Sequence, residues 1–149
     1  MKLTRHYQIK VRSASSKDAT RIAVLSTQLG YPASAVQMRK RIIKSVADRN
    51  QALFVAEMSG KVIGWLQVSI QVLIMHDNEA EVGGFVVDGH ARRSGVGRLL
   101  MERAEQWSRE RGCHSVYLRT NIIREDAHAF YEKLGYKIIK TQYAFRKQI

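Results

Sequence analysis

The chain has 149 residues, 45% of them hydrophobic, which allows one domain with one sizeable core. Its 25 Lys and Arg against 13 Asp and Glu give a net charge of +12, which favours an anionic partner such as nucleic acid, a membrane surface or a phosphorylated small molecule. With no apolar run long enough for a bilayer, no secretory signal and one cysteine, Cys113, we expect a cytoplasmic protein without disulfides.

The first third of the chain predicts a strand and two helices. Residues 7–14 alternate enough for a strand, and a helix capped by a serine follows over about 15–29. Gly30 ends this helix, and Pro32 suits the start of a second helix over about 33–48.

The second predicted helix carries a basic cluster, Arg39, Lys40, Arg41 and Lys44, and residues 1–60 hold 11 Lys and Arg against 3 Asp and Glu. Such a cluster is usually a solvated face. The alternative is a surface that recruits an anion, and the sequence does not decide between the two.

Three strands are predicted next. Residues 52–58 and 61–74 flank Ser59-Gly60, a compact hairpin signal, and the second run alternates as a long half-buried strand does. The third strand, 81–87, contains Gly83-Gly84, which indicates a bulge or a close backbone approach.

The remaining pattern predicts a helix to about Arg111, a strand over 115–120, a helix over 125–134 and a strand over 136–145. Helix-ending glycines follow both helices, at Gly112 and Gly135. The element order indicates an α/β (α+β) fold, a single domain over 1–149 with a mixed, mostly antiparallel twisted sheet flanked by helices.

A glycine-rich stretch, Arg92-Arg93-Ser94-Gly95-Val96-Gly97, joins the third of these strands to its helix. Glycines let backbone N–H groups approach a ligand, and the first turn of a helix adds unpaired N–H groups and a positive dipole end. With Arg92, Arg93 and Arg98 around it, this seam suits a phosphate or pyrophosphate. The plain alternative is a tight strand-to-helix turn.

Two other phosphate-binding motifs fit this stretch less well. A P-loop requires Lys-Ser/Thr after its last glycine, and none follows Gly97. A dinucleotide fingerprint belongs in the first βαβ unit and has a third glycine where this chain has Leu100.

The pattern Arg-x-x-Gly-x-Gly, late in the domain and after three antiparallel-type strands, resembles the acyl-CoA pyrophosphate loop of the GNAT superfamily of N-acetyltransferases. The segment AHAFYEKLGY, 127–136, is similar to the second GNAT motif, with Tyr131 in the familiar tyrosine position. The chain departs from many members at Gly89, where they have proline, and at Arg124, where they have an asparagine that touches the cofactor arm. The sequence around this second motif looks most like that of a branch of small-amine acetyltransferases, which includes those acting on aminoalkylphosphonates.

The resemblance implies a function. The enzyme would move an acetyl group from acetyl-CoA to a primary amine of a small molecule by direct attack, without a metal and without Cys113 as a nucleophile. The expected cofactor-binding residues are Phe85, Val86, Val87, Arg92, Arg93, Ser94, Gly95, Val96, Gly97, Arg98, Asn121 and Tyr131. A backbone N–H near Phe85–Val87 would polarise the thioester carbonyl.

The expected catalytic residues are Glu81 as general base and Tyr131 as the acid that protonates the departing thiolate. From the residues alone, Glu81 is equally a solvated carboxylate at a strand end and Tyr131 a core tyrosine. We expect Tyr31, Glu81 and His128 at the acceptor. For His128 the alternatives are a proton relay and a packed side chain, and packing is the favoured interpretation. Leu29, Trp65 and Tyr143 are further candidates by position.

Alternatives of other classes remain at this point. A basic nucleic-acid-binding module would explain the charge, but the sequence has no helix-turn-helix, zinc pair or exposed aromatic platform. A GNAT fold that binds acyl-CoA without catalysis is a second alternative. A metal enzyme lacks support because no two histidines share ligand spacing. The positive charge predicts an acceptor that bears an anionic group, and GNAT proteins are often homodimers.

Overall fold

The computed structural model describes residues 8–149, so the first residue of the strand predicted over 7–14 lies outside the described residues. The chain divides into two compact units, one ending at Leu118 and one comprising Arg119–Ile149. The first unit contains β1 (Ile9–Ser13), α1 (Ala19–Leu29), α2 (Ala35–Ala47), β2 (Gln51–Met58), β3 (Lys61–Gln71), β4 (Glu79–Val87), α3 (Val96–Glu110) and β5 (Val116–Leu118). The second unit contains α4 (Glu125–Lys133).

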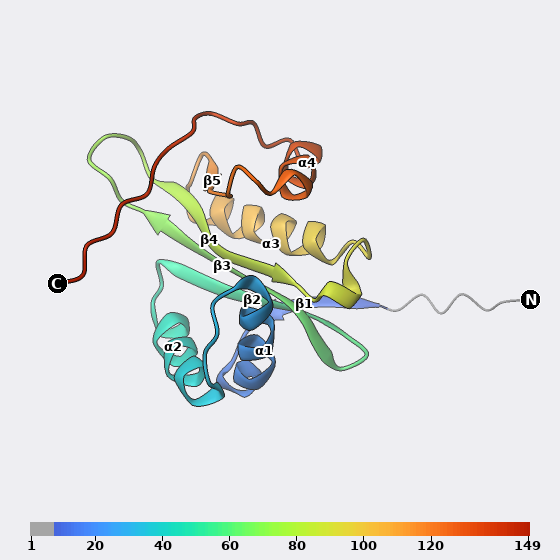
Figure 1. Cartoon of the computed structure of the whole chain (residues 1–149). Coiled ribbons are helices and arrows are strands. Elements are labelled where there is room, and N and C mark those ends of the chain that lie inside the picture. The colour runs from blue at the N-terminus through green and yellow to red at the C-terminus, as the bar shows by residue number, and fades with distance from the viewer. Residues whose placement is uncertain (1–7) are drawn as a thin grey trace, which may run out of the picture. The chain divides into compact units, whose positions relative to one another are not determined.

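The five strands form one sheet in the order β1-β2-β3-β4-β5, with antiparallel pairing up to β4 and parallel pairing between β4 and β5. Helices α1 and α2 cover one face of this sheet and α3 covers the other (Figure 1). The predicted mixed, mostly antiparallel sheet with flanking helices is confirmed.

The hairpin between β2 and β3 is built by the two predicted residues. Ser59 and Gly60 both have positive φ, 51° and 76°, as a type I′ turn requires. This turn joins two antiparallel strands with the twist that a sheet needs.

A bulge in β4 sets which of its side chains face α1 and α2. Gln67 pairs with Gly84 but Val68 pairs with Val82, so Gly83 is the extra residue. Because cross-strand partners share a face, Glu81, which is opposite Ser69, lies on the same face as Gly84. The bulge predicted from Gly83-Gly84 is confirmed, and its consequence is a change of parity that places Glu81 on the side of α1 and α2.

Each face of the sheet has its own apolar layer. Facing α1 and α2, the buried cluster comprises Ala14, Ala19, Ile22, Ala23, Leu25, Met38, Ile42, Leu53, Val55, Val62, Trp65 and Val86. On the other face, Gly64 lies so close to α3 that a Cβ would stand 3.1 Å from Leu100 and 3.2 Å from Val96. Helices therefore pack on both faces of the central strands, and this packing fixes the position of β4.

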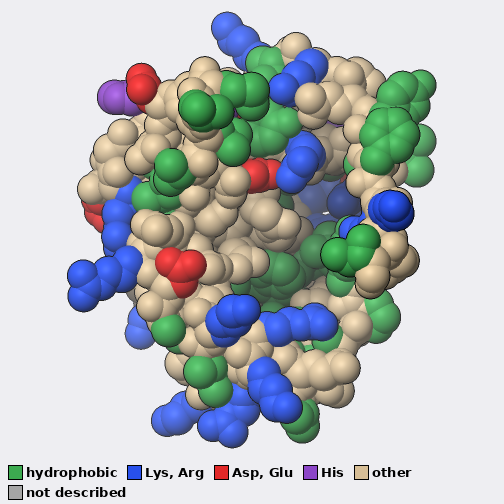
Figure 2. Space-filling model, turned by 90° about the vertical axis from the view of Figure 1, so that its left-hand side faces the viewer, with side chains coloured by type: hydrophobic (Ala, Val, Ile, Leu, Met, Phe, Trp, Pro, Cys, Tyr) green, Lys and Arg blue, Asp and Glu red, His purple; other side chains and the backbone are tan. Residues whose placement is uncertain are grey.

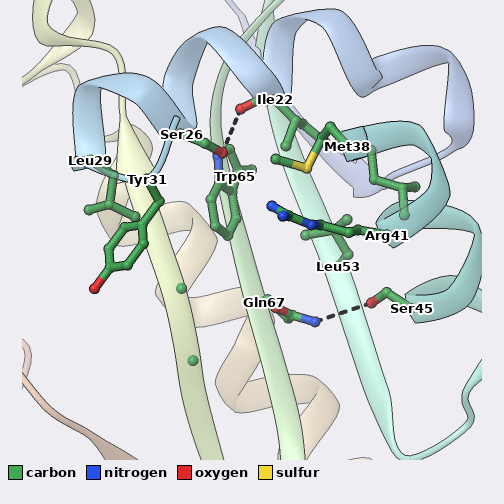
Figure 3. A pocket seen from close by; sticks show the side chains of 13 residues that line it. Ile22, Ser26, Leu29, Tyr31, Met38, Arg41, Ser45, Leu53, Trp65 and Gln67 are labelled. Carbon is green, nitrogen blue, oxygen red and sulfur yellow. Dashed lines mark hydrogen bonds between the residues drawn. The ribbon is translucent and has the colours of Figure 1, made fainter. Parts of the chain in front are cut away.

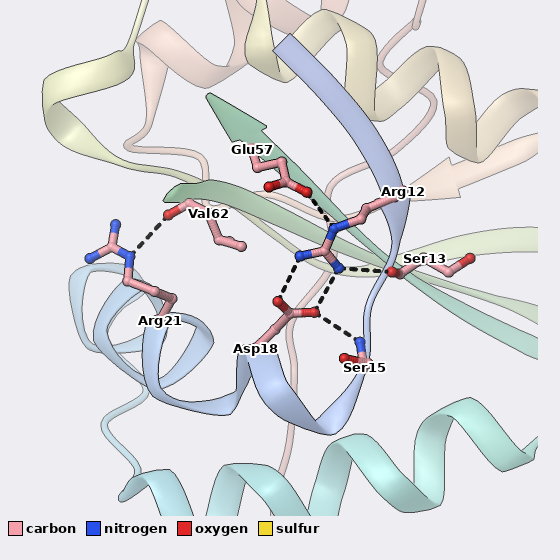
Figure 4. Close-up of polar contacts among 7 residues, drawn as sticks. All are labelled: Arg12, Ser13, Ser15, Asp18, Arg21, Glu57 and Val62. Carbon is pink, nitrogen blue, oxygen red and sulfur yellow. Dashed lines mark hydrogen bonds and ion pairs between the residues drawn. The ribbon is translucent and has the colours of Figure 1, made fainter. Parts of the chain in front are cut away.

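Ion pairs fix the start of α1 to the sheet (Figure 4). Arg12 of β1 pairs with Asp18 at 2.8 Å and with Glu57 of β2 at 2.6 Å, while Asp18 also accepts the Ser15 N–H. These contacts, led by the Arg12 hydrogen bond, hold the pKa of the Asp18 carboxyl below its ordinary value. The buried Asp18 carboxylate thus holds the start of α1 against the sheet.

Two sequence predictions about strands are wrong. The strand predicted over 136–145 is absent, since described residues 136–149 form neither helix nor strand. Adjacent Ile138 and Ile139 break the alternation that would give this segment one apolar face. The strand predicted over 61–74 ends at Gln71, the last residue with a β4 partner, and beyond it Val72 and Ile74 are exposed.

Candidate functional site

The link from β4 to α3 is anchored by α1. Arg21 of α1 donates to Asp88 at 3.0 Å and to the Val62 carbonyl at 3.0 Å, and Gln28 accepts the Gly89 N–H at 3.1 Å. Asp88 is buried and also caps a short 3-10 turn by accepting the His90 N–H. That backbone hydrogen bond and the Arg21 contact keep the pKa of Asp88 below its ordinary value, so the anchor is an ionised carboxylate.

Residues 92–98, which we call the arginine loop, turn the backbone into the first turn of α3. Arg93 and Gly95 both have positive φ, 63° and 86°, and Gly95 is the helix cap. The first helical hydrogen bond runs from the Leu99 N–H to the Gly95 carbonyl, so the amides of Val96, Gly97 and Arg98 precede the ladder. The loop therefore presents amide donors at the positive end of a 15-residue helix, as a phosphate site does.

The loop's side chains differ in how far their charges are compensated. Arg98 pairs with Glu102 at 2.8 Å, and both are exposed. Arg92 and Arg93 are exposed and have no ion-pair partner among residues 8–149. Ser94 donates its hydroxyl hydrogen to the Ala91 carbonyl. This hydrogen bond shapes the loop and leaves no hydroxyl hydrogen to donate to a ligand.

Next to this loop, β4 separates from β5. The parallel pairing runs from Ala80–Val116 to Val82–Leu118 and ends there. β4 itself continues to Val87, five residues beyond this last pair. Phe85 and Val87 are half-buried and Val86 is buried in the core, and since all three side chains are apolar, these predicted cofactor residues have only backbone groups for polar contacts.

A pocket of about 270 Å³ lies between the two N-terminal helices and the sheet (Figure 3). Its lining comes from two helices, the link between them and three strands: Ile22, Ser26, Leu29, Tyr31, Met38, Arg41, Ile42, Ser45, Leu53, Trp65, Gln67, Gly83 and Gly84. We call it the Trp65 pocket. The positional candidates Leu29, Tyr31 and Trp65 all line it, whereas Met38, Arg41, Leu53 and Gln67 were not singled out from the sequence as pocket residues.

The Trp65 indole forms one wall of this pocket against Gly84. A Cβ on Gly84 would stand 2.6 Å from the ring, so only glycine leaves the ring this position. Trp65 is 9% exposed, and its indole N–H is buried without an acceptor among the described residues. Besides forming the bulge, the glycine pair leaves space for the Trp65 ring. The sequence indicated this contact only as a close backbone approach.

A hydrogen-bonded corner closes the pocket on the α2 side. The Gln67 amide donates to Gln51 at 2.7 Å and to Ser45 at 3.2 Å, and the Ser45 hydroxyl donates to Gln51 at 2.9 Å. Since these groups satisfy one another, the corner is a fixed wall. The single charged lining side chain among the described residues is Arg41.

Glu81 lies in β4 on the same face as this pocket. It pairs with Ser69 of β3, two residues along from Gln67, and its side chain is half-buried. Register therefore places the predicted base on the pocket side of the sheet, one bulge away from Gly84.

The second unit holds the remaining candidates. Asn121 accepts the Ile123 N–H through its side chain and the Arg124 N–H through its carbonyl, which shapes the entry to α4. His128 contacts the Asn121 carbonyl at 3.0 Å through Nε2, so this nitrogen carries the donated proton. The contact favours a structural role for His128 over a proton relay.

Tyr131 lies in α4 among aromatic rings. It makes edge-to-face contacts with Phe130 and Tyr136, at centroid distances of 5.3 and 6.1 Å. Burial raises the pKa of its phenol, and the nearby positive charge of Arg124 opposes this only in part. The hydroxyl is therefore protonated at neutral pH, as a proton donor must be.

Other chemistry finds less support. Cys113 is buried, and burial raises the pKa of its thiol, so it is a poor nucleophile. Within residues 8–149, no three His, Cys, Asp or Glu side chains gather as metal ligands do. None of the helices described in that range combines the length and apolar character that crossing a bilayer requires.

The chain is similar to known acetyltransferases in sequence and in fold. The profile of the acetyltransferase (GNAT) family matches residues 18–136. An uncharacterised N-acetyltransferase of Chlorobaculum tepidum is 30% identical over 133 residues, 89% of this chain and 78% of its own. The aminoalkylphosphonate N-acetyltransferase of Salmonella typhimurium is 29% identical over 146 residues, 94% of this chain and 91% of its own. The structure of an aminoglycoside N-acetyltransferase in complex with CoA has a TM-score of 0.86 at 18% identity and covers 99% of both chains.

Proposed function

The chain belongs to the acetyltransferase (GNAT) family of acetyl-CoA-dependent N-acetyltransferases, and we propose that it transfers an acetyl group to a primary amine of a small molecule by direct attack. The single observation that carries this proposal is the arginine loop. Its amides precede the helical ladder beside two uncompensated arginines, in the segment that carries the family's cofactor motif. A single domain over 1–149 and a cytoplasmic location belong to the same proposal, the latter supported by the lone cysteine.

Acetyl-CoA would bind along the first unit. Its diphosphate would accept hydrogen bonds from the amides of Val96, Gly97 and Arg98 and pair with Arg92 and Arg93. The pantetheine arm would run along β4 beyond its last β5 pair, Val82–Leu118, and would contact backbone groups of Phe85–Val87. An N–H of that segment would stabilise the oxyanion that develops on the thioester carbonyl.

The transfer itself needs a base for the acceptor ammonium and an acid for the departing thiolate. Glu81 is proposed as the base, because it lies on the pocket face of β4. Tyr131 is proposed as the acid, because its phenol is kept protonated by burial. The nitrogen–carbon bond forms as the carbon–sulfur bond breaks, and the proton lost by the amine is matched by the one gained by sulfur.

The acceptor would occupy the Trp65 pocket, with Tyr31 at its exposed margin. The net charge of +12 and the excess of Lys and Arg side chains on the face shown in Figure 2 favour an acceptor with an anionic group over a polycation. The relatives include enzymes named for an aminoalkylphosphonate and for an aminoglycoside, so assays with amines of both kinds distinguish the two acceptor classes.

Thiol release from acetyl-CoA, measured with a panel of amines and followed by mass spectrometry of the products, tests the proposal. We expect amine-dependent release with an acetylated amine as product and no acetylated enzyme intermediate. Saturable coenzyme A binding without acetylation of any amine would favour a non-catalytic acyl-CoA-binding protein instead.

A further inference from the structure

Arg41 stands apart from the rest of the basic cluster. Arg39, Lys40 and Lys44 belong to the same helix but do not line the Trp65 pocket, whereas Arg41 does. Figure 3 shows its side chain leaving α2 and extending across the pocket toward Trp65. The basic cluster is thus divided: one of its four side chains lines the pocket and three do not.

The charge of Arg41 is uncompensated within the described residues. No ion pair or hydrogen bond of its guanidinium is present there, no acidic residue occurs in α2, and no acidic side chain lines the pocket. The buried polar atom of the lining without a partner, the Trp65 indole N–H, is also a donor. The pocket is therefore electropositive, and a cationic ligand group gains nothing at the Arg41 end.

The body of the pocket is apolar between this charge and β4. Leu29, Met38, Leu53 and Trp65 supply its walls, which suit a carbon spacer, and the Arg41 side chain is exposed at its end of the pocket. Its volume of about 270 Å³ equals roughly nine water-sized groups at about 30 Å³ each. The positive charge of Arg41 disfavours a polycationic aminoglycoside in this pocket.

The two ends of the pocket are close together. Arg41 extends toward Trp65 of β3, and Gly83 and Gly84 belong to the neighbouring strand β4, about 4.8 Å away in a sheet. An acceptor that places its anion at Arg41 and its amine beside β4 therefore needs only a short spacer. Glu81, on the same face of β4, lies on the amine side of this arrangement.

From these contacts we propose that Arg41 selects the acceptor, and that the acceptor is a short-chain amine whose other end carries a carboxylate, phosphonate or phosphate group. This inference rests on the proposed function, since it concerns the acceptor of the same reaction. Arg41 acts as a specificity residue: it pairs with the anion and takes no part in proton transfer.

A matched series of amines tests this directly. β-Alanine, propanolamine and diaminopropane share one chain length and differ in the sign of the terminal group, and aminoethylphosphonate and phosphoethanolamine add the other two anions. We expect kcat/KM for the best anionic amine to exceed that for propanolamine by about ten- to hundredfold, the range of a hydrogen-bonded ion pair. Diaminopropane and kanamycin should be the poorest substrates, and the ranking of the anionic amines identifies the anion.

Arg41→Gln and the control Lys44→Gln separate selection from general charge. Arg41→Gln should remove at least nine-tenths of the preference for the anionic amine over propanolamine through KM, with kcat changed less than twofold. Lys44→Gln, which removes the same charge from the same helix outside the pocket, should leave the preference intact. Equal losses in both variants, or a wild-type enzyme that prefers diaminopropane or kanamycin, would overturn the inference while leaving the acetyltransferase proposal standing.

A binding measurement keeps the inference testable if no amine is acetylated. The chain has two tryptophans, and only Trp65 lines the pocket, while Trp107 is buried in α3. Titration with β-alanine or aminoethylphosphonate should shift the Trp65 indole N–H signal in a nitrogen-15 NMR spectrum, leave the Trp107 signal in place, and lose its effect in Arg41→Gln. A shift that persists in Arg41→Gln, or no shift with any anionic amine, would contradict the role of Arg41.

Discussion

The arginine loop takes its donors from consecutive residues, 92–98, whereas the Trp65 pocket takes its lining from two helices, the link between them and three strands. Backbone amides and a helix terminus bind phosphate with little regard to the side chains around them. The pocket, by contrast, has one charge, one indole wall and one glycine that makes room for it. If Arg41 selects the acceptor as proposed, a single substitution there should change the preferred amine without altering the arginine loop.

The two regions share one support. Arg21 and Gln28 of α1 hold the start of the loop, and Ile22, Ser26 and Leu29 of the same helix line the pocket. Changes within each region should consequently leave the other unaffected, while changes in α1 or its partners should disturb both.

The largest effect is expected for Tyr131→Phe, which removes the proposed proton donor and belongs to neither region. Acetyl transfer should fall by about 10²- to 10⁴-fold, the usual contribution of an acid or base. Coenzyme A affinity measured by calorimetry and acceptor affinity measured by NMR should both stay within about twofold. Phe130→Leu, beside it on α4, serves as the control for loss of aromatic packing.

The double variant Arg92→Gln/Arg93→Gln tests the loop alone. Two lost charge-assisted contacts should weaken coenzyme A binding about a hundredfold and flatten its dependence on salt. The preference of the pocket among amines, measured at saturating acetyl-CoA, should be unchanged. Arg109→Gln, at the far end of α3, removes an exposed charge and should leave coenzyme A affinity as it is.

Gly84→Ala tests the pocket alone, because its Cβ would meet the Trp65 ring at 2.6 Å. We expect a loss of about 1–3 kcal/mol in the free energy of unfolding and a raised KM for the amine. Gly83→Ala is a matched control, since nothing lies within 4 Å of its Cβ. Similar amine KM values in the two variants would show that the Trp65 wall does not shape the acceptor site.

Asp88→Ala tests the shared support. Loss of the Arg21 contact and of the cap on the His90 N–H should cost about 1–2 kcal/mol of stability in urea unfolding and weaken coenzyme A binding modestly. Because the pKa of Asp88 is lowered in the fold from 3.8, its contribution is complete above that value and is lost as the pH falls through the folded pKa. The gap between wild type and variant should therefore close in acid, and a gap that stays constant would contradict this assignment.

The smallest effect is expected for Cys113→Ala. The thiol is buried and its raised pKa keeps it protonated, so turnover should change less than twofold and iodoacetamide should not inactivate the native enzyme. Rapid inactivation that Cys113→Ala prevents would point to a covalent route instead of direct attack.

The sequence predicted the loop better than the pocket for a physical reason. A backbone-built anion site leaves a contiguous signature, and Gly95 with positive φ at the cap of α3 sits where that signature indicated. The Trp65–Gly84 contact and the role of Arg41 depend on which residues share a face across strands and helices. In β4 the extra residue Gly83 decides which side chains face α1 and α2. The sequence predicts a bulge there but does not say which face each side chain takes.

The errors in the sequence reading have the same origin. The alternation over 61–74 predicts a strand as far as Ile74, and the sequence predicts another over 136–145, yet a strand exists only where a neighbour supplies its hydrogen bonds. Beyond Gln71 that neighbour is missing, because β4 begins pairing at Glu79. Helices, whose hydrogen bonds are internal, were placed within about two residues at α2, predicted over 33–48 and observed over Ala35–Ala47.

Calorimetric titration of coenzyme A into the purified chain tests the central claim most directly. We expect one saturable site per chain, weakened by salt and weakened about a hundredfold in Arg92→Gln/Arg93→Gln but not in Arg41→Gln. Absence of any saturable heat, or affinity that the double variant leaves unchanged, would show that the amides and arginines at the start of α3 do not hold the diphosphate.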